Sequence, residues 1–282
     1  MKLMRVNMEK LEVRWEPVPP VFEQLGGRAL IAKLLLEEIL PACEALGPHN
    51  KLVFTPGLLA GGGVTTAGRL SVGGKSPLTG GVKEANGGGT AGDTLAKLGI
   101  KAIVVEDRAP RGDWYVLHVT GDSASLLPAG DLMGLGTYAT SDRLQERYGA
   151  DSTVISIGQA GEYLMYGASI AITGDRDQRS NHAARGGLGA VMGSKGLKAI
   201  VIDKPLGKSI PLADADLFRT AMRTLGTSVC TLSSISAAGN PKLRISAALS
   251  TRIPVPVVML SESITRTRFS APSCRTASVA FL

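Results

Sequence analysis

Residues 85–92 read Ala-Asn-Gly-Gly-Gly-Thr-Ala-Gly, and residues 99–106 continue with Gly-Ile-Lys-Ala-Ile-Val-Val-Glu. The same order returns 97 residues later without a gap, as His-Ala-Ala-Arg-Gly-Gly-Leu-Gly at 182–189 and Gly-Leu-Lys-Ala-Ile-Val-Ile-Asp at 196–203. In each copy a glycine-rich segment and a short helix candidate precede an apolar run that is typical of a buried strand. We therefore expect an internal duplication that builds two similar, pseudo-symmetric α+β units.

Apolar strand candidates at 52–54 and 154–157 stand upstream in the two copies, which gives pseudo-repeats of about 50–107 and 150–204. Ahead of the first repeat, residues 29–40 carry apolar residues at helical spacing, and Pro41 is expected to end that helix. The predicted fold class is α+β, an internally duplicated β-sheet domain over residues 1–208. Residues 209–282 are expected to form a short helical or irregular tail.

Charge is distributed unevenly along the chain. The chain has 31 basic and 24 acidic residues, which gives a net charge of +7. Residues 227–282 hold six of the basic residues and one of the acidic residues, so most of the net charge belongs to this tail. Bulk charge therefore gives no reason to expect nucleic-acid binding by the body. A basic nucleic-acid binder would depend on the tail alone, whose two aromatic residues, Phe269 and Phe281, are too few for base stacking.

The sequence contains no obvious membrane or export signal. No apolar run approaches the roughly 18 to 20 residues of a membrane span, and residues 1–15 alternate charged and single apolar residues. We expect a soluble, cytoplasmic protein. The three cysteines, Cys43, Cys230 and Cys274, are far apart and are expected to be unpaired thiols.

The duplicated glycine segments leave two interpretations open. A glycine-rich turn that leads into a helix exposes backbone N–H groups and lets an anion approach the main chain, so two such loops suit two similar anionic groups. The alternative is that the glycines permit tight packing of the duplicated sheets. Neither loop has the spacing of a nucleotide P-loop or of a dinucleotide-binding fold.

Basic residues beside these glycines are candidates for anion binding. Arg69 and Arg185 adjoin Gly68 and Gly186, and Lys75 precedes a Ser-Pro pair. A guanidinium group matches a pair of phosphate oxygens and stays charged, although each arginine could equally be an ordinary surface residue. His49, His118 and His182 are scattered, and we assign no general base or nucleophile.

Three longer motifs carry a family resemblance. Residues 75–81 read Lys-Ser-Pro-Leu-Thr-Gly-Gly, residues 157–162 read Ile-Gly-Gln-Ala-Gly-Glu, and residues 185–195 read Arg-Gly-Gly-Leu-Gly-Ala-Val-Met-Gly-Ser-Lys. With Glu-Ala-Asn and the glycine run at 84–89, they resemble the N-terminal domain of aldehyde:ferredoxin oxidoreductases. The resemblance extends from about residue 4 to about residue 203.

The resemblance implies an oxidoreductase that converts an aldehyde to a carboxylic acid. Members of the family hold tungsten, or sometimes molybdenum, between the dithiolenes of two pyranopterins whose phosphates are bridged by Mg²⁺. Electrons leave through a [4Fe-4S] cluster to ferredoxin, so the implied partners are a ferredoxin-type acceptor, a small aldehyde and, in a homodimer, a second copy of the chain. The chain itself would supply only the pterin and magnesium platform. The alternative is a non-catalytic fragment that binds pterin or a partner.

The resemblance also assigns residues to that platform. Carried over by position, the cofactor-binding residues are Arg69, Lys75, Asn86, Gly88, Gly89, Asn181, His182, Ala183, Arg185 and Gly186. Asn86 and His182 would bind magnesium through their backbone carbonyls. The family commonly has Arg-Ala where this chain has Asn181-His182, so one phosphate-facing arginine is replaced.

The tail departs from the rest of the sequence. Residues 214–226 are expected to begin a helix, but 17 of the last 56 residues are Ser or Thr and helical spacing fades. The cysteines expected for a cluster are absent, because [4Fe-4S] ligation normally needs four thiolates and the chain has three cysteines. We expect a truncated or frame-shifted sequence after about residue 230, with a divergent tail as the alternative.

Overall fold

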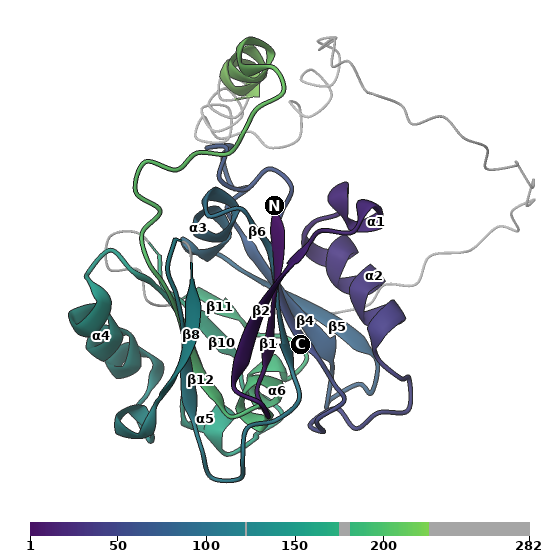
Figure 1. Ribbon diagram of the computed structural model, residues 1–282, viewed down its shortest axis with the longest axis vertical. Helices are drawn as coiled ribbons and strands as arrows, with labels where there is room; N and C mark the ends of the chain where they lie inside the picture. The colour runs from purple at the N-terminus through teal and green to yellow at the C-terminus, as the bar shows by residue number, and fades with distance from the viewer. Residues whose placement is uncertain (122, 175–180, 226–282) are drawn as a thin grey trace, which may run out of the picture. The chain divides into compact units, whose positions relative to one another are not determined.

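The computed structural model describes residues 1–121, 123–174 and 181–225. The chain divides into two units, Met1–Gly226 and Thr227–Leu282, and the second lies outside the described residues. Twelve strands are described in the first unit (Figure 1): β1 (Lys2–Asn7), β2 (Glu12–Pro17), β3 (Leu52–Pro56), β4 (Leu70–Lys75), β5 (Val82–Gly87), β6 (Ile100–Glu106), β7 (Tyr115–Val119), β8 (Ala124–Pro128), β9 (Thr153–Ser156), β10 (Ile170–Ile172), β11 (Asn181–Ala183) and β12 (Leu197–Ile202).

The helices stand between groups of one to three strands along the chain. They are α1 (Pro20–Glu23), α2 (Gly27–Glu38), α3 (Ala91–Lys97), α4 (Thr137–Tyr148), α5 (Gln159–Glu162) and α6 (Leu188–Ser194), with a 3₁₀ turn, η1, at Gly130–Leu132. A further helix occupies 215–225, where the sequence predicts one. The expectation of an α+β domain with duplicated sheets is confirmed.

The strands form two six-stranded sheets with the same internal order. The first runs β2-β1-β6-β3-β4-β5, and the second runs β8-β7-β12-β9-β10-β11. Each sheet has one parallel pair, β1 with β6 and β7 with β12, and its other pairs are antiparallel. The correspondence includes the hairpins β1–β2 and β7–β8, which lie outside the expected repeats of 50–107 and 150–204. The limits of the domains themselves stay a prediction.

The repeated apolar runs explain how the layers pack. In β6, Ile103 and Val105 face the central core, whereas Ala102 and Val104 face α2. The equivalent run in β12 alternates in the same way between the central core and α4. Helices α3 and α6 contact strands of both sheets, so the central core is shared by the two halves. A strand that is covered on both faces needs a continuous apolar run, which is what both copies supply.

Helix α2 confirms the helix predicted at 29–40, displaced by two residues at each end. Its residues Leu30, Ile31, Leu34 and Leu35 are buried against the first sheet. The helix ends before Pro41, which cannot donate a backbone hydrogen bond. Within the described part of the chain, no helix has the length and apolar content that crossing a bilayer requires.

Candidate functional site

The glycine run of the first repeat lies at the junction of the two sheets. β5 and β11 are the last strands of their sheets, and they contact each other. A Cβ atom on Gly87 would lie 2.5 Å from Ile172 Cδ1, and one on Gly89 would lie 2.4 Å from the carbonyl oxygen of Thr173. Gly89 also has a φ of +98°, a conformation that favours glycine. The packing interpretation of the glycines therefore holds for these two positions.

A pocket of about 300 Å³ opens beside this junction. Its lining combines residues from both repeats and from the start of α2: Arg28, Arg69, Glu84, Ala85, Asn86, His182, Ala184 and Arg185. The lining thus includes three guanidinium groups and one carboxylate. Because an arginine stays protonated at any physiological pH, the pocket has a permanent excess of positive charge that suits an anion.

Arg69 and Asn86 are joined within this pocket. The Nε atom of Arg69 donates to the side-chain Oδ1 of Asn86, and a terminal nitrogen of Arg69 donates to the backbone carbonyl of Asn86 at 3.2 Å. Asn86 lies on β5 directly opposite Ser71 of β4. The antiparallel pairing therefore determines where Arg69 is held, although both side chains remain exposed to solvent.

The second repeat contributes His182 and Arg185 to the same pocket. The Nδ1 atom of His182 lies 2.9 Å from the hydroxyl oxygen of Ser169. Arg185 is exposed, and no hydrogen bond or ion pair is seen for it among residues 1–121, 123–174 and 181–225. Its guanidinium is therefore available to a ligand.

Five other predicted site residues lie next to this lining. Gly88 stands beside Asn181, whose Oδ1 would be 2.8 Å from a Cβ on that glycine. Gly89 and Ala183 are at the packed junction, and Ala183 is fully buried. Gly186 has a φ of +76°, and a Cβ there would meet the Lys83 side chain at 2.4 Å. The three glycines and Ala183 contribute mainly backbone beside the pocket, because glycine has no side chain and that of alanine is short.

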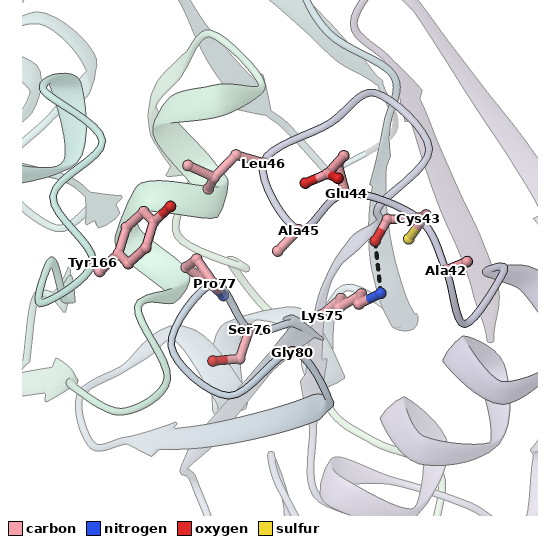
Figure 2. Close-up of a pocket in the computed structure, with 10 residues that line it drawn as sticks. All are labelled: Ala42, Cys43, Glu44, Ala45, Leu46, Lys75, Ser76, Pro77, Gly80 and Tyr166. Carbon is pink, nitrogen blue, oxygen red and sulfur yellow. Dashed lines mark hydrogen bonds between the residues drawn. The ribbon is translucent and has the colours of Figure 1, made fainter.

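Lys75 is the predicted site residue that the structure places elsewhere. It ends β4, whereas Arg69 precedes that strand, and six residues of strand at about 3.3 Å each separate them by roughly 20 Å. Lys75 Nζ donates to the carbonyl oxygens of Cys43, at 2.6 Å, and Pro41. It lines a different pocket of about 320 Å³ together with Cys43, Ser76 and Tyr166 (Figure 2).

Sequence reasoning missed Arg28 and Glu84. Arg28 Nε lies 3.1 Å from Glu84 Oε2, and the Glu84 side chain is 8% exposed. Arg28 comes from the first turn of α2, directly after Gly26-Gly27, so a glycine pair beside an arginine was the available signal. Glu84 belongs to the Glu-Ala-Asn motif at 84–86 but was not expected in the site, because a carboxylate repels anions.

The residues offer limited ligands for a divalent cation. No group of three or more His, Cys, Asp or Glu side chains gathers in the described residues. A magnesium ion here would take its oxygens from a bound phosphate and from backbone carbonyls, which suits its preference for oxygen ligands. The carbonyl of Asn86 already accepts the Arg69 guanidinium, so a cation would share that oxygen with a positive charge.

Other charged groups serve the fold. Lys198 Nζ pairs with Glu162 and donates to the carbonyl oxygen of Leu135 at 3.0 Å. His118 lies in β7, with its Nε2 2.8 Å from Asp203 Oδ1. Cys43 is a free thiol, whereas Cys230 and Cys274 lie outside the described residues.

Comparisons with known proteins agree with this architecture. Residues 3–204 match the family described as aldehyde ferredoxin oxidoreductase, N-terminal domain. Two relatives are named tungsten-containing aldehyde ferredoxin oxidoreductase: that of Thermococcus kodakarensis is 37% identical over 225 residues, and that of Pyrococcus furiosus is 36% identical. Both alignments cover 79% of this chain and 36% of the relative. The chain therefore spans about a third of the length of these relatives.

A solved structure shares the fold. It is the active site complex BamBC of benzoyl coenzyme A reductase in complex with 1,5-dienoyl-CoA. It superposes with a TM-score of 0.70 at 30% sequence identity and covers 76% of this chain and 32% of that chain. The similarity again concerns one part of a longer protein.

Proposed function

The chain belongs to the aldehyde ferredoxin oxidoreductase family through its N-terminal domain, and from this premise we propose that the pocket between β5 and β11 binds the phosphate groups of a tungsten pyranopterin cofactor. The observation that carries the proposal is the convergence of three arginines, Arg28, Arg69 and Arg185, on one pocket formed by both repeats. A duplicated domain with one guanidinium-lined junction suits a ligand with two similar anionic ends.

The residues present fit the anionic part of such a group. Guanidinium groups bind phosphate oxygens through charge-assisted hydrogen bonds, and Arg185 has its donors free of the described residues. The tight glycines Gly87 and Gly89 bring the two strand edges together, so that Arg69 of one repeat and Arg185 of the other line a single pocket. The pocket volume of about 300 Å³ holds phosphate groups rather than the whole cofactor, whose rings would extend beyond it.

Each residue has a stated role in this proposal. Arg69 and Arg185 bind phosphate oxygens, and Asn86 orients Arg69. The backbone carbonyls of Asn86 and His182 would hold a magnesium ion, which would neutralise part of the phosphate charge. When bound, the tungsten centre supplies the redox chemistry, while this chain positions it.

The activity proposed for the whole protein is oxidation of an aldehyde to a carboxylic acid. Its electrons would pass through a [4Fe-4S] cluster to ferredoxin, as the names of the relatives suggest for the acceptor. The three cysteines of this chain fall short of the four thiolates of such a cluster. The cluster and the substrate channel would therefore need residues beyond this chain, which alone is proposed to be inactive.

The test is cofactor retention by purified protein. The chain is produced anaerobically with tungstate in a host that makes the pterin cofactor, and tungsten, molybdenum, magnesium and released pterin are quantified. The variant that carries Arg69→Gln together with Arg185→Gln is expected to lose both pterin and metal. Arg143→Gln, on the exposed face of α4, removes one equivalent charge away from the pocket and is expected to retain them. Equal retention by all three proteins would contradict the proposal.

A further inference from the structure

A continuous chain of hydrogen bonds runs along β4 and β5 and joins two arginines of the pocket. Arg28 Nε lies 3.1 Å from Glu84 Oε2, and the Ser71 hydroxyl donates to Glu84 Oε1 at 2.7 Å. Asn86 Nδ2 donates to the same Ser71 oxygen at 3.2 Å, and Asn86 Oδ1 accepts from Arg69 Nε. Both carboxylate oxygens of Glu84 are thus engaged, one towards each arginine.

The register of the sheet makes this chain feasible. Ser71 is opposite Asn86, and Gly73 is opposite Glu84. Side chains two residues apart on a strand share a face, so Glu84 and Asn86 lie on the same side of β5 with the Ser71 hydroxyl between them. Ser71 is 4% exposed, which keeps water from replacing it in the chain.

The burial of Glu84 contrasts with the exposure of its partner. The Glu84 side chain is 8% exposed, whereas that of Arg28 is 81% exposed. Burying a carboxylate is unfavourable unless it is paired and hydrogen-bonded. A carboxylate that lines an anion pocket also repels the ligand. Its place there is explained if it holds the guanidinium groups in position.

We propose that Glu84 is a positioning residue of this pocket: it fixes Arg28 directly and Arg69 through Ser71 and Asn86, so that both guanidinium groups face a bound phosphoryl group. This inference rests on the proposed function, because it supposes that the pocket takes a phosphate-type anion. Arg185, which has no such support within the described chain, is then the arginine that adapts to the ligand. Orienting donors before binding lowers the entropic cost of ordering them.

The inference makes a prediction opposite to that of simple charge repulsion. If Glu84 acts only as a negative charge, Glu84→Gln removes repulsion and phosphate binds more tightly. If it positions the arginines, Glu84→Gln weakens binding, by roughly tenfold for the loss of well-oriented charge-assisted contacts. Ser71→Ala leaves the charge unchanged and breaks only the Arg69 branch, so it is expected to weaken binding less.

The experiment measures the dissociation constant of inorganic phosphate by calorimetry at fixed ionic strength, using the full chain. The variants are Glu84→Gln, Arg28→Gln, the double variant of these two, and Ser71→Ala. Glu146→Gln, on the exposed side of α4, is the matched control for net charge and is expected to bind as the unchanged chain does. Because Glu84 acts partly through Arg28, the effects of the two substitutions overlap. The phosphate affinity of the double variant is therefore expected to fall by less than the product of the two single-variant decreases.

A spectroscopic readout separates positioning from a general loss of fold. The Nε–H resonances of Arg28 and Arg69, followed by ¹⁵N NMR without phosphate, are expected to be protected from exchange in the unchanged chain. Both should lose protection in Glu84→Gln, and Arg69 alone should lose it in Ser71→Ala. If Glu84→Gln does not fold, Ser71→Ala still tests the inference through the Arg69 signal and its phosphate affinity.

The outcomes distinguish this inference from the proposed function. If the unchanged chain binds phosphate and Glu84→Gln binds it equally well or more tightly, the positioning role is wrong and the proposed function stands. If the unchanged chain does not bind phosphate, both are overturned. Weaker binding by Glu84→Gln, with joint loss of protection at the two arginines, supports the inference.

Discussion

Lys195 shows how a single buried charge couples this fold to pH. Its side chain is fully buried, and its ammonium group donates to the carbonyl oxygens of Pro48, at 2.9 Å, Gly47, at 3.2 Å, and Asn50. These bonds tie the end of α6 to the loop that precedes β3. Burial lowers the pKa of Lys195 from its ordinary value of 10.5 to about 7, because the charged form loses its hydration.

The sign of the resulting pH dependence follows from linkage. Between pH 7 and 10.5 the unfolded chain binds a proton at Lys195 that the folded chain does not. The free energy of unfolding therefore rises with pH across this window, and this stability is lost as the pH falls from 10.5 towards 7. We expect Lys195→Met to flatten the rise. Because the variant lacks the two N–H donors of the neutral amine present at pH 9.5, we also expect it to destabilise the protein by about 1–3 kcal/mol at that pH.

Urea denaturation at several pH values checks this prediction. The difference in unfolding free energy between the unchanged chain and Lys195→Met should grow from pH 7 to pH 9.5. Lys10→Met, at an exposed position of the β1–β2 turn, is the control and should follow the unchanged chain. Parallel pH profiles for the unchanged chain and Lys195→Met would show that Lys195 does not titrate in this range.

The sequence predicted some of the residues that line the pocket and not others. Arg69, Asn86 and Arg185 were expected, and they line one pocket. Arg28 and Glu84 were not, because their ion pair joins residues 56 positions apart and depends on how α2 packs against the sheet. Lys75 belongs to a recognisable motif, but it lies at the opposite end of β4 from Arg69.

Among the elements, glycines matter most where β5 approaches the second sheet. Gly89 follows β5 and approaches the second sheet, with a φ of +98° and room for no side chain beside Thr173. We expect Gly89→Ala to destabilise the protein by more than about 2 kcal/mol, since it combines backbone strain with steric overlap. Thermal unfolding followed by circular dichroism measures the effect.

A matched glycine substitution tests whether the position matters. A Cβ on Gly81 would meet no atom within 4 Å, and its backbone does not require glycine. Gly81→Ala is therefore expected to change stability by less than about 0.5 kcal/mol. Equal effects at the two glycines would mean that the junction between β5 and the second sheet is not tightly packed.

Elements with a strong apolar pattern were the ones that the sequence predicted. α2 has helical spacing, and β6 and β12 are continuous apolar runs covered on both faces. The hairpins were missed because their pattern is weaker. In β2, for example, no residue is fully buried, and its place follows from pairing with β1. Such edge strands depend on the partner strand rather than on their own burial.

At the scale of the whole molecule, the two repeats share one hydrophobic core. The central cluster contains Phe54 and Ile103 of the first sheet together with Ile155 and Ile200 of the second. The Thr90 and Thr153 hydroxyls, 2.8 Å apart, add a hydrogen bond between the halves. We expect the halves to unfold together, because neither can keep its core without the other.

The two tryptophans of the chain allow a direct test. Trp15 lies in β2 of the first sheet, and Trp114 lies just before β7 of the second. The single-tryptophan variants Trp15→Phe and Trp114→Phe then report on one half each. Their fluorescence should give urea midpoints that coincide with the circular dichroism midpoint of the same variant. Separate transitions for the two reporters would show independent halves.

The sequence predicted the duplication, but only the structure shows how the two repeats together form the pocket. The repeated segments at 85–106 and 182–203 predicted two similar units. They did not show that the last strands of the two sheets meet, which depends on long-range packing. That meeting places arginines of both repeats around one pocket, and the proposed function depends on it.

The stoichiometry of bound cofactor tests the central proposal most directly. After anaerobic purification from a tungstate-supplied, cofactor-competent host, pterin released from the folded chain is quantified against tungsten. The account predicts two pterins for each tungsten, held by both repeats and lost together when Arg69 and Arg185 are replaced by glutamine. A folded chain without pterin, or one that keeps its pterin and tungsten after both replacements, would contradict it.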